Sequence, residues 1–129
     1  PFVEQDEYDL LLWSCDLNIV RGEDSFVRAQ WAARPMLWHI YPQADDAHLK
    51  KLDAFLERYN RQLPENCLSP LCHIFESFNR GTPIDPLLSN WLSQSIPLLR
   101  QHAENWATEL REPRDLMNQL VQDAHSWLQ

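Results

Sequence analysis

The chain has 129 residues and a formal net charge of −8, from 19 acidic and 11 basic side chains. This length suits one domain, or a part of one, that buries a core. The negative charge argues against non-specific nucleic-acid binding and against an anionic membrane surface as the main partner. No apolar run reaches the roughly 18 residues that a membrane-spanning helix needs. We therefore expect a soluble protein that binds neither nucleic acid nor membranes.

The cysteines and glycines indicate the cellular compartment and exclude two classes of nucleotide-binding protein. Three cysteines, an odd number without framework spacing, are typical of reduced thiols, so we expect a cytoplasmic protein. The only two glycines, Gly22 and Gly81, exclude the glycine-rich phosphate loops of Rossmann dinucleotide sites and of P-loop NTPases. The chain begins at Pro1 without a methionine, and we expect it to be a piece of a longer protein.

The first part of the chain alternates helical and apolar segments. The pattern predicts a helix, a strand, a second helix and a second strand over residues 6–15, 17–20, 25–33 and 36–41. Strand, helix and strand with short connections form a βαβ unit, in which the two strands are parallel. A competing interpretation makes residues 25–41 one helix kinked at Pro35. A proline in a helix interior costs about 3 kcal/mol, which favours the βαβ unit.

The rest of the chain is predicted to be helical. Prolines, caps and apolar stripes divide it into segments that begin at Asp45, Ser69-Pro70, Asp85-Pro86, Pro97 and Glu112-Pro113. Pro64 is expected to end the first of these segments, and Gly81 the second. Most of the six tryptophans are expected in the core. The predicted fold class is α/β, with a Rossmann-like βαβ unit followed by a mostly helical remainder.

The turn over residues 21–25 is the strongest candidate for a functional site. It joins the first strand to a helix N-terminus, where backbone N–H groups favour an anion. Arg21 adds a fixed positive charge with a fork geometry suited to phosphate oxygens. Gly22 allows a close backbone turn, and the amides of Asp24 and Ser25, with the Ser25 hydroxyl, can bond the anion. We interpret this turn as a site for the diphosphate of a nucleotide-sugar.

A second segment is expected at the same edge. Parallel strands end together, so Tyr41 to Gln43 should lie near the turn. Glu23 beside a diphosphate is unfavourable unless it faces sugar hydroxyls, a catalytic proton path or a cation. On spacing alone the simpler interpretation is favoured, in which Asp24-Ser25 is an ordinary helix cap and Arg21 a surface charge. His48, at a helix start, is expected in solvent.

Two uninterrupted runs carry a family resemblance. Residues 21–32 read Arg-Gly-Glu-Asp-Ser-Phe-Val-Arg-Ala-Gln-Trp-Ala, and residues 38–43 read Trp-His-Ile-Tyr-Pro-Gln. With the lead-in over residues 1–16 and the run Asp46-Ala47-His48-Leu49, they resemble the bacterial protein-arginine rhamnosyltransferases that modify translation elongation factor P. The resemblance covers about residues 1–56. Ala33-Arg34 stands where the family leads us to expect a glycine, a change at a turn that affects packing more than chemistry.

The resemblance implies a fold and a reaction. The fold is that of a GT-B glycosyltransferase, with two Rossmann-like domains facing a cleft, and residues 1–129 form its C-terminal donor-binding domain. The donor is dTDP-β-L-rhamnose, and rhamnose passes with inversion to a guanidinium nitrogen of an arginine in elongation factor P. The N-terminal domain of the same enzyme carries the aspartate proposed as general base, so this chain should not turn over alone. Neither a metal nor another cofactor is implied.

The resemblance also implies residue roles. Diphosphate binding falls to Arg21, Asp24 and Ser25, and Glu23 lies near the transferred sugar as a catalytic residue. The remaining donor contacts are Phe2 stacking on the thymine, Gln5 bonding the base edge, and Tyr41 reaching the donor from the second strand. The alternative is an all-helical interaction or regulatory module without catalytic activity, which the helices after residue 45 and the tryptophans support.

Overall fold

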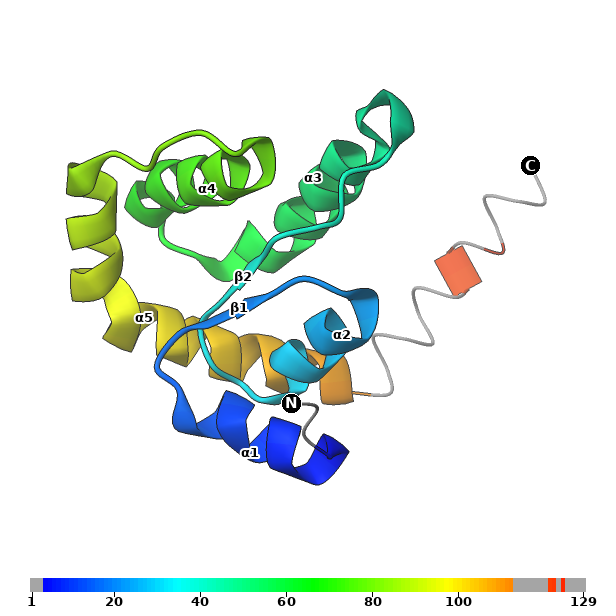
Figure 1. Ribbon diagram of the computed structural model, residues 1–129. Coiled ribbons are helices and arrows are strands. Elements are labelled where there is room, and N and C mark those ends of the chain that lie inside the picture. Colours follow the sequence, from blue (N-terminus) through cyan, green and yellow to red (C-terminus); the bar gives the residue numbers. More distant parts are fainter. Residues whose placement is uncertain (1–3, 113–120, 123, 125–129) are drawn as a thin grey trace.

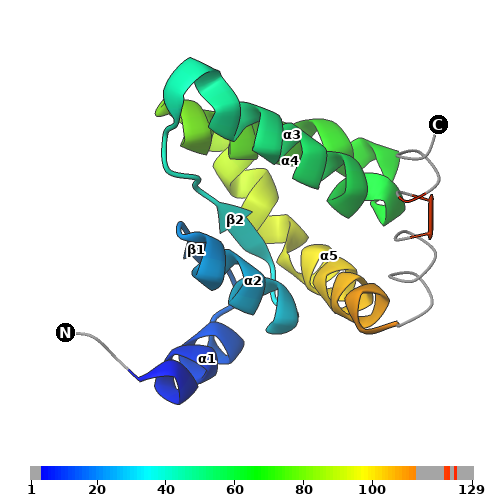
Figure 2. The ribbon, with the colours of Figure 1, turned by 90° about the vertical axis from the view of Figure 1, so that its right-hand side faces the viewer.

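The computed structural model describes residues 4–112, 121, 122 and 124, and these are mostly helical around a small parallel sheet (Figure 1). In chain order the elements are α1 (Gln5–Ser14), β1 (Asn18–Val20), α2 (Glu23–Trp31), β2 (Met36–Trp38), the 3-10 helix η1 (Ala44–Asp46), α3 (Ala47–Tyr59), the 3-10 helix η2 (Asn60–Gln62), α4 (Glu65–Arg80) and α5 (Pro86–Arg111). Figure 2 shows α3 and α4 side by side, across the strands from α1 and α2. Phe2 and most of the predicted last helix lie outside the described residues.

The predicted βαβ unit is confirmed. β1 and β2 pair in parallel, with Asn18 opposite Met36 and Val20 opposite Trp38, and α2 connects them. The two alternatives, a single helix over 25–41 and an all-helical module, are therefore wrong. The second strand is shorter than predicted because a side chain takes over its pairing. Asn79 of α4 accepts from the Ile40 N–H and donates to the Trp38 carbonyl, both at 2.8 Å.

Two predicted helix starts are wrong, because prolines lie inside helices. α4 begins at Glu65 and runs through Pro70, and α5 runs through Pro97. Each proline removes one backbone hydrogen bond. In α4 the buried stripe continues across Pro70, from Cys67 to Leu71 and beyond, and this burial outweighs the lost bond. In Figure 1, α5 bends in its first half, as proline-containing helices do.

Other predicted boundaries are confirmed or shifted slightly. Gly81 ends α4 with φ +69°, the left-handed conformation that glycine adopts without strain. The Asp85 side chain accepts from the Leu87 N–H at 2.8 Å and starts α5, with Pro86 as first helical residue. Asp45 does not cap α3. It lies in η1, and Asp46 precedes α3 with φ +56°.

An aromatic cluster forms the centre of the core. The rings of Phe26 and Trp38 stack at 3.7 Å, and Phe55 meets both edge-on. Tyr59 and Trp106 extend the cluster, so that α2, β2, α3 and α5 share it. The tryptophan prediction holds only in part, because Trp38 and Trp106 are buried whereas Trp13 and Trp31 are 52% and 42% exposed.

The helix α1 buries little of its apolar surface. Leu12 is buried, whereas Leu11 and Cys15 are exposed. Leu10 and Trp13 are also exposed. The helix touches the rest of the described chain mainly through α2, so its other faces stay uncovered by the described residues.

Candidate functional site

The N-terminus of α2 is open. Gly22 is the residue before the helix, and within the described residues no side chain caps it. The first bond of the helix runs from the Phe26 N–H to the Gly22 carbonyl, at 2.9 Å. The N–H groups of Glu23, Asp24 and Ser25 therefore have no partner within the helix. The simpler interpretation, in which Asp24-Ser25 caps the helix, is wrong because both residues already lie in its first turn.

Gly22 has an ordinary backbone, contrary to the role expected for it. Its φ of −65° and ψ of 156° suit any residue. A Cβ built on Gly22 meets no atom of the described residues within 4 Å. The protein itself does not require a glycine here, and the space beside the helix N-terminus is open.

Arg21 and Tyr41 lie together, as the shared strand edge predicts. The Arg21 guanidinium carbon is 4.4 Å from the centre of the Tyr41 ring, which is 56% exposed. The buried Trp38 fixes the turn from below, because its indole N–H donates to the Arg21 carbonyl at 3.0 Å. The backbone of Arg21 is thus held at the edge by a hydrogen bond from the core.

Lys51 is the residue that sequence reasoning missed. It lies on α3, and its Nζ is 3.3 Å from Glu23 Oε1 at the start of α2. Glu23 beside a diphosphate needs sugar hydroxyls, a proton path or a cation as its partner, and Lys51 is such a cation. The position of Lys51 in the chain could have indicated this contact, because α3 follows the strand that ends at the same edge as the turn.

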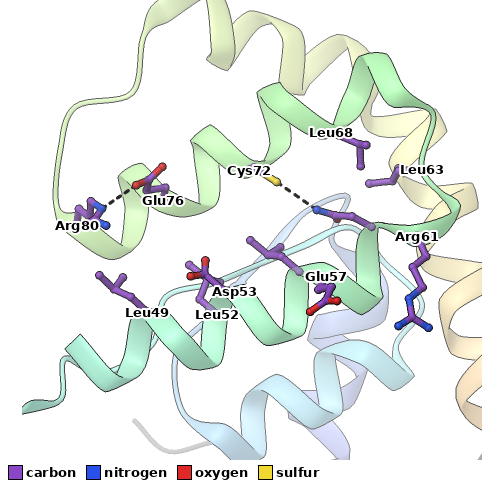
Figure 3. Close-up of a pocket in the computed structure, with 12 residues that line it drawn as sticks. Leu49, Leu52, Asp53, Glu57, Arg61, Leu63, Leu68, Cys72, Glu76 and Arg80 are labelled. Atoms are coloured by element: carbon purple, nitrogen blue, oxygen red, sulfur yellow. Dashed lines mark hydrogen bonds and ion pairs between the residues drawn. The ribbon is translucent and has the colours of Figure 1, made fainter. Parts of the chain in front are cut away.

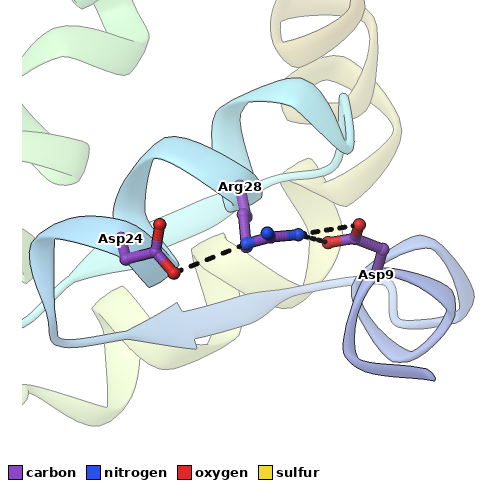
Figure 4. Close-up of polar contacts among 3 residues, drawn as sticks. All are labelled: Asp9, Asp24 and Arg28. Atoms are coloured by element: carbon purple, nitrogen blue, oxygen red, sulfur yellow. Dashed lines mark hydrogen bonds and ion pairs between the residues drawn. The ribbon is translucent and has the colours of Figure 1, made fainter. Parts of the chain in front are cut away.

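A charged triad joins α1 to α2 (Figure 4). Nη1 of Arg28 donates to both carboxylate oxygens of Asp9 at 2.9 Å, and Nε lies 3.5 Å from Asp24 Oδ2. The hydrogen bond that Arg28 donates to Asp9 is the main cause that raises the pKa of Arg28. Asp24 is 83% exposed and faces Arg28. Gln5 lies one turn before Asp9 on the same face of α1 and is exposed.

Two histidines flank the edge. Burial, and then the charge of Arg21, lower the pKa of His39. His48 is buried, so its expected solvent exposure is wrong, and its Nδ1 accepts from the Gln43 N–H at 3.1 Å. This bond ties the loop after β2 to the start of α3.

A separate cavity of about 620 Å³ lies between α3 and α4 (Figure 3). Leucine side chains form much of its lining. The side chain of Asn60, which also lines the cavity, donates to Cys72 Sγ at 3.3 Å. Asn60 Oδ1 is buried and finds no partner in the part of the chain that the structure describes. None of the predicted site residues lines this cavity.

The described ranges show neither a metal-binding cluster nor a membrane-spanning helix. These ranges contain no group of three or more His, Cys, Asp or Glu side chains placed to hold a metal ion. The helices among the described residues include none that is long and apolar enough to cross a membrane.

Known proteins resemble this chain over nearly all of its length. A protein-arginine rhamnosyltransferase of Pseudomonas aeruginosa is 49% identical over 130 residues, which is 99% of this chain and 34% of that protein. Its counterpart in Shewanella oneidensis is 46% identical over 95% of this chain and 31% of that protein. The chain thus spans about a third of the length of these relatives and matches their C-terminal part.

A solved structure supports the same relationship. It concerns the structural basis for EarP-mediated arginine glycosylation of translation elongation factor EF-P, and it is 42% identical to this chain with a TM-score of 0.75. The match covers 98% of this chain and 39% of that one. The family described as Elongation-Factor P (EF-P) rhamnosyltransferase EarP matches residues 1–125. This chain therefore belongs to the EarP family of EF-P rhamnosyltransferases.

Proposed function

We propose that this chain is the donor-binding part of an inverting GT-B glycosyltransferase. The enzyme transfers L-rhamnose from dTDP-β-L-rhamnose to an arginine of translation elongation factor P, in the cytoplasm. Residues 1–129 form its C-terminal, Rossmann-like domain, and the N-terminal domain of the same enzyme is the second partner. Family membership supports the reaction, and the open N-terminus of α2 beside Arg21 is the observation that carries the site.

The diphosphate occupies the N-terminus of α2 in this proposal. The N–H groups of Asp24 and Ser25 point outward and, with the Ser25 hydroxyl, donate to phosphate oxygens. Arg21 supplies the positive charge, and its contact with Tyr41 orders the guanidinium beforehand. Charge that develops on the leaving diphosphate meets donors that are already in place, which lowers the barrier without reorganisation. We propose no cofactor besides the donor substrate.

The other donor groups extend from this point. Phe2 stacks on the thymine and Gln5 bonds its edge, from the start of the chain and of α1, while Tyr41 borders the diphosphate. Open space at Gly22 admits a phosphate oxygen close to the backbone. Glu23 lies beside the transferred sugar. The base that takes the proton from the acceptor guanidinium comes from the N-terminal domain, so this chain binds donor and does not turn over alone.

The test is calorimetric titration of dTDP into this chain, with UDP as the control nucleotide. Arg21→Ala removes charged hydrogen bonds and should weaken dTDP binding by about 1.5–3 kcal/mol. Gly22→Ala should lower stability only by the roughly 0.5–1 kcal/mol that alanine costs relative to glycine before a helix, since a Cβ there meets no described atom, and it should also weaken dTDP binding. Arg34→Ala is the matched control, because Arg34 donates to the Trp13 carbonyl at the other end of α2. Equal dTDP affinity in Arg21→Ala and Arg34→Ala would contradict the diphosphate assignment.

A further inference from the structure

The ion pair of Glu23 with Lys51 is not explained by stability. The Glu23 side chain is 77% exposed and that of Lys51 45% exposed, with 3.3 Å between Oε1 and Nζ. Solvent screens such a pair, and exposed pairs contribute about 0–1 kcal/mol. The place of the pair is more informative, because Glu23 is the first residue of α2 and Lys51 comes from another helix.

Glu23 creates a charge conflict at the open N-terminus of α2. A carboxylate at the first helical position is attracted to the same N–H groups and the same positive helix end that a diphosphate needs. Left free, the Glu23 carboxylate would compete with the anion and repel it. Lys51 holds this carboxylate on the α3 side instead, and it cancels the negative charge.

The start of α3 is built so that Lys51 stays at this edge. Lys51 lies one turn after the buried His48, whose Nδ1 holds the Gln43 N–H. Asp45 and Asp46 just before the helix both have φ +56°, a conformation that costs free energy for residues other than glycine. The hydrogen bond between the Gln43 N–H and His48 ties the loop after β2 to the start of α3 and keeps Lys51 within reach of Glu23.

We propose that Lys51 is a positioning residue of the donor site. It acts through Glu23: it keeps the carboxylate away from the amides of α2 that receive the diphosphate, and near the transferred sugar. This inference rests on the proposed function of the turn and adds a residue from α3 to it.

The experiment measures dTDP affinity of the 129-residue chain and its variants by calorimetry at two salt concentrations. Lys51→Met should weaken binding about three- to tenfold, with a smaller effect at high salt because salt screens exposed charges. Lys51→Arg should restore affinity. Lys50→Met is the matched control, since neighbouring Lys50 is exposed and has no ion pair among the described residues.

The double variant Lys51→Met with Glu23→Gln decides how Lys51 acts. If Lys51 acts through Glu23, the double variant regains the affinity of the unaltered chain, because no free carboxylate remains. A double variant as weak as Lys51→Met would overturn the proposal, since it would place Lys51 directly on the phosphate or in a structural role. Equal affinity of Lys51→Met and Lys50→Met would overturn it while the function stands. Failure of the unaltered chain to bind dTDP would overturn the function, and the role of Lys51 with it.

Discussion

The helix ends of the α4–α5 region differ from those of α2. In the α4–α5 region, Gly81 ends α4 in the left-handed conformation, and the Asp85 carboxylate accepts from the Leu87 N–H at the start of α5. α2 lies beside the candidate site. It begins after Gly22 without a side-chain cap in the described structure, and it has an alanine, Ala33 at φ +55°, instead of a glycine at its left-handed end.

These helix ends indicate a structural role for the α4–α5 region and a binding role for the start of α2. The α4–α5 region has a left-handed glycine at the end of α4 and a side-chain cap at the start of α5, although α4 itself begins, like α2, without a side-chain cap from the described residues. α2 carries Asp24 and Ser25 in its first turn, two residue types that cap helices well, yet the helix starts before them and leaves three amides free. We interpret the open start as a preference for an outside anion, and the Ala33 end as strain that the surrounding packing tolerates.

Asn79→Ala should have the largest effect and tests the scaffold side of this comparison. The Asn79 side chain donates to the Trp38 and Phe75 carbonyls and accepts from the Ile40 N–H, each at 2.8 Å. Its loss leaves buried groups unpaired, so the free energy of unfolding should fall by about 2–4 kcal/mol in urea titrations. Asn90→Ala, at an exposed position of α5, should cost less than about 0.5 kcal/mol. Equal losses of unfolding free energy in Asn79→Ala and Asn90→Ala would contradict a structural role for the Asn79 side chain.

A pair of aspartate variants tests the comparison directly. Asp85→Ala removes a real cap and should lower the free energy of unfolding by about 1 kcal/mol. Asp24→Ala should change it by less than about 0.5 kcal/mol, because Asp24 caps nothing and is mostly exposed. Thermal unfolding of the two variants measures both effects. A larger loss in Asp24→Ala than in Asp85→Ala would show that α2 is capped after all.

Ala33→Gly should have the smallest effect, and it is stabilising. Relief of the left-handed strain, about 1–2 kcal/mol, exceeds the entropy cost of a glycine, about 0.5–1 kcal/mol. Ala32→Gly is the control, since Ala32 is buried with right-handed dihedral angles and should be destabilised by the same change. Thermal unfolding that ranks the two variants the other way would contradict the strain at Ala33.

Local chemistry made the βαβ unit and the candidate turn predictable. A β-branched run that stops at Arg21-Gly22 and a second run that stops at Pro42 give strand ends, and parallel strands bring these ends to one edge. The contact of Arg21 with Tyr41 follows from that rule. At Ala33-Arg34, where the family resemblance leads us to expect a glycine, Ala33 has the left-handed conformation that glycine adopts without strain.

Other features depend on tertiary packing, which the sequence pattern does not contain. α4 continues through Pro70 because buried residues before and after the proline outweigh its local cost in free energy. The pairing of Lys51 with Glu23 joins residues from two helices, and nothing local to either marks it. The exposure of Leu11 on α1 reflects how little of that helix the rest of the described chain covers.

The most direct test of the central claim is the response of the backbone amide resonances to dTDP. We expect the N–H signals of Glu23, Asp24 and Ser25 to shift saturably as dTDP is added, together with the side-chain signal of Arg21, and we expect Arg21→Ala to weaken this response. Saturable shifts confined to another region, such as the cavity between α3 and α4, would contradict it.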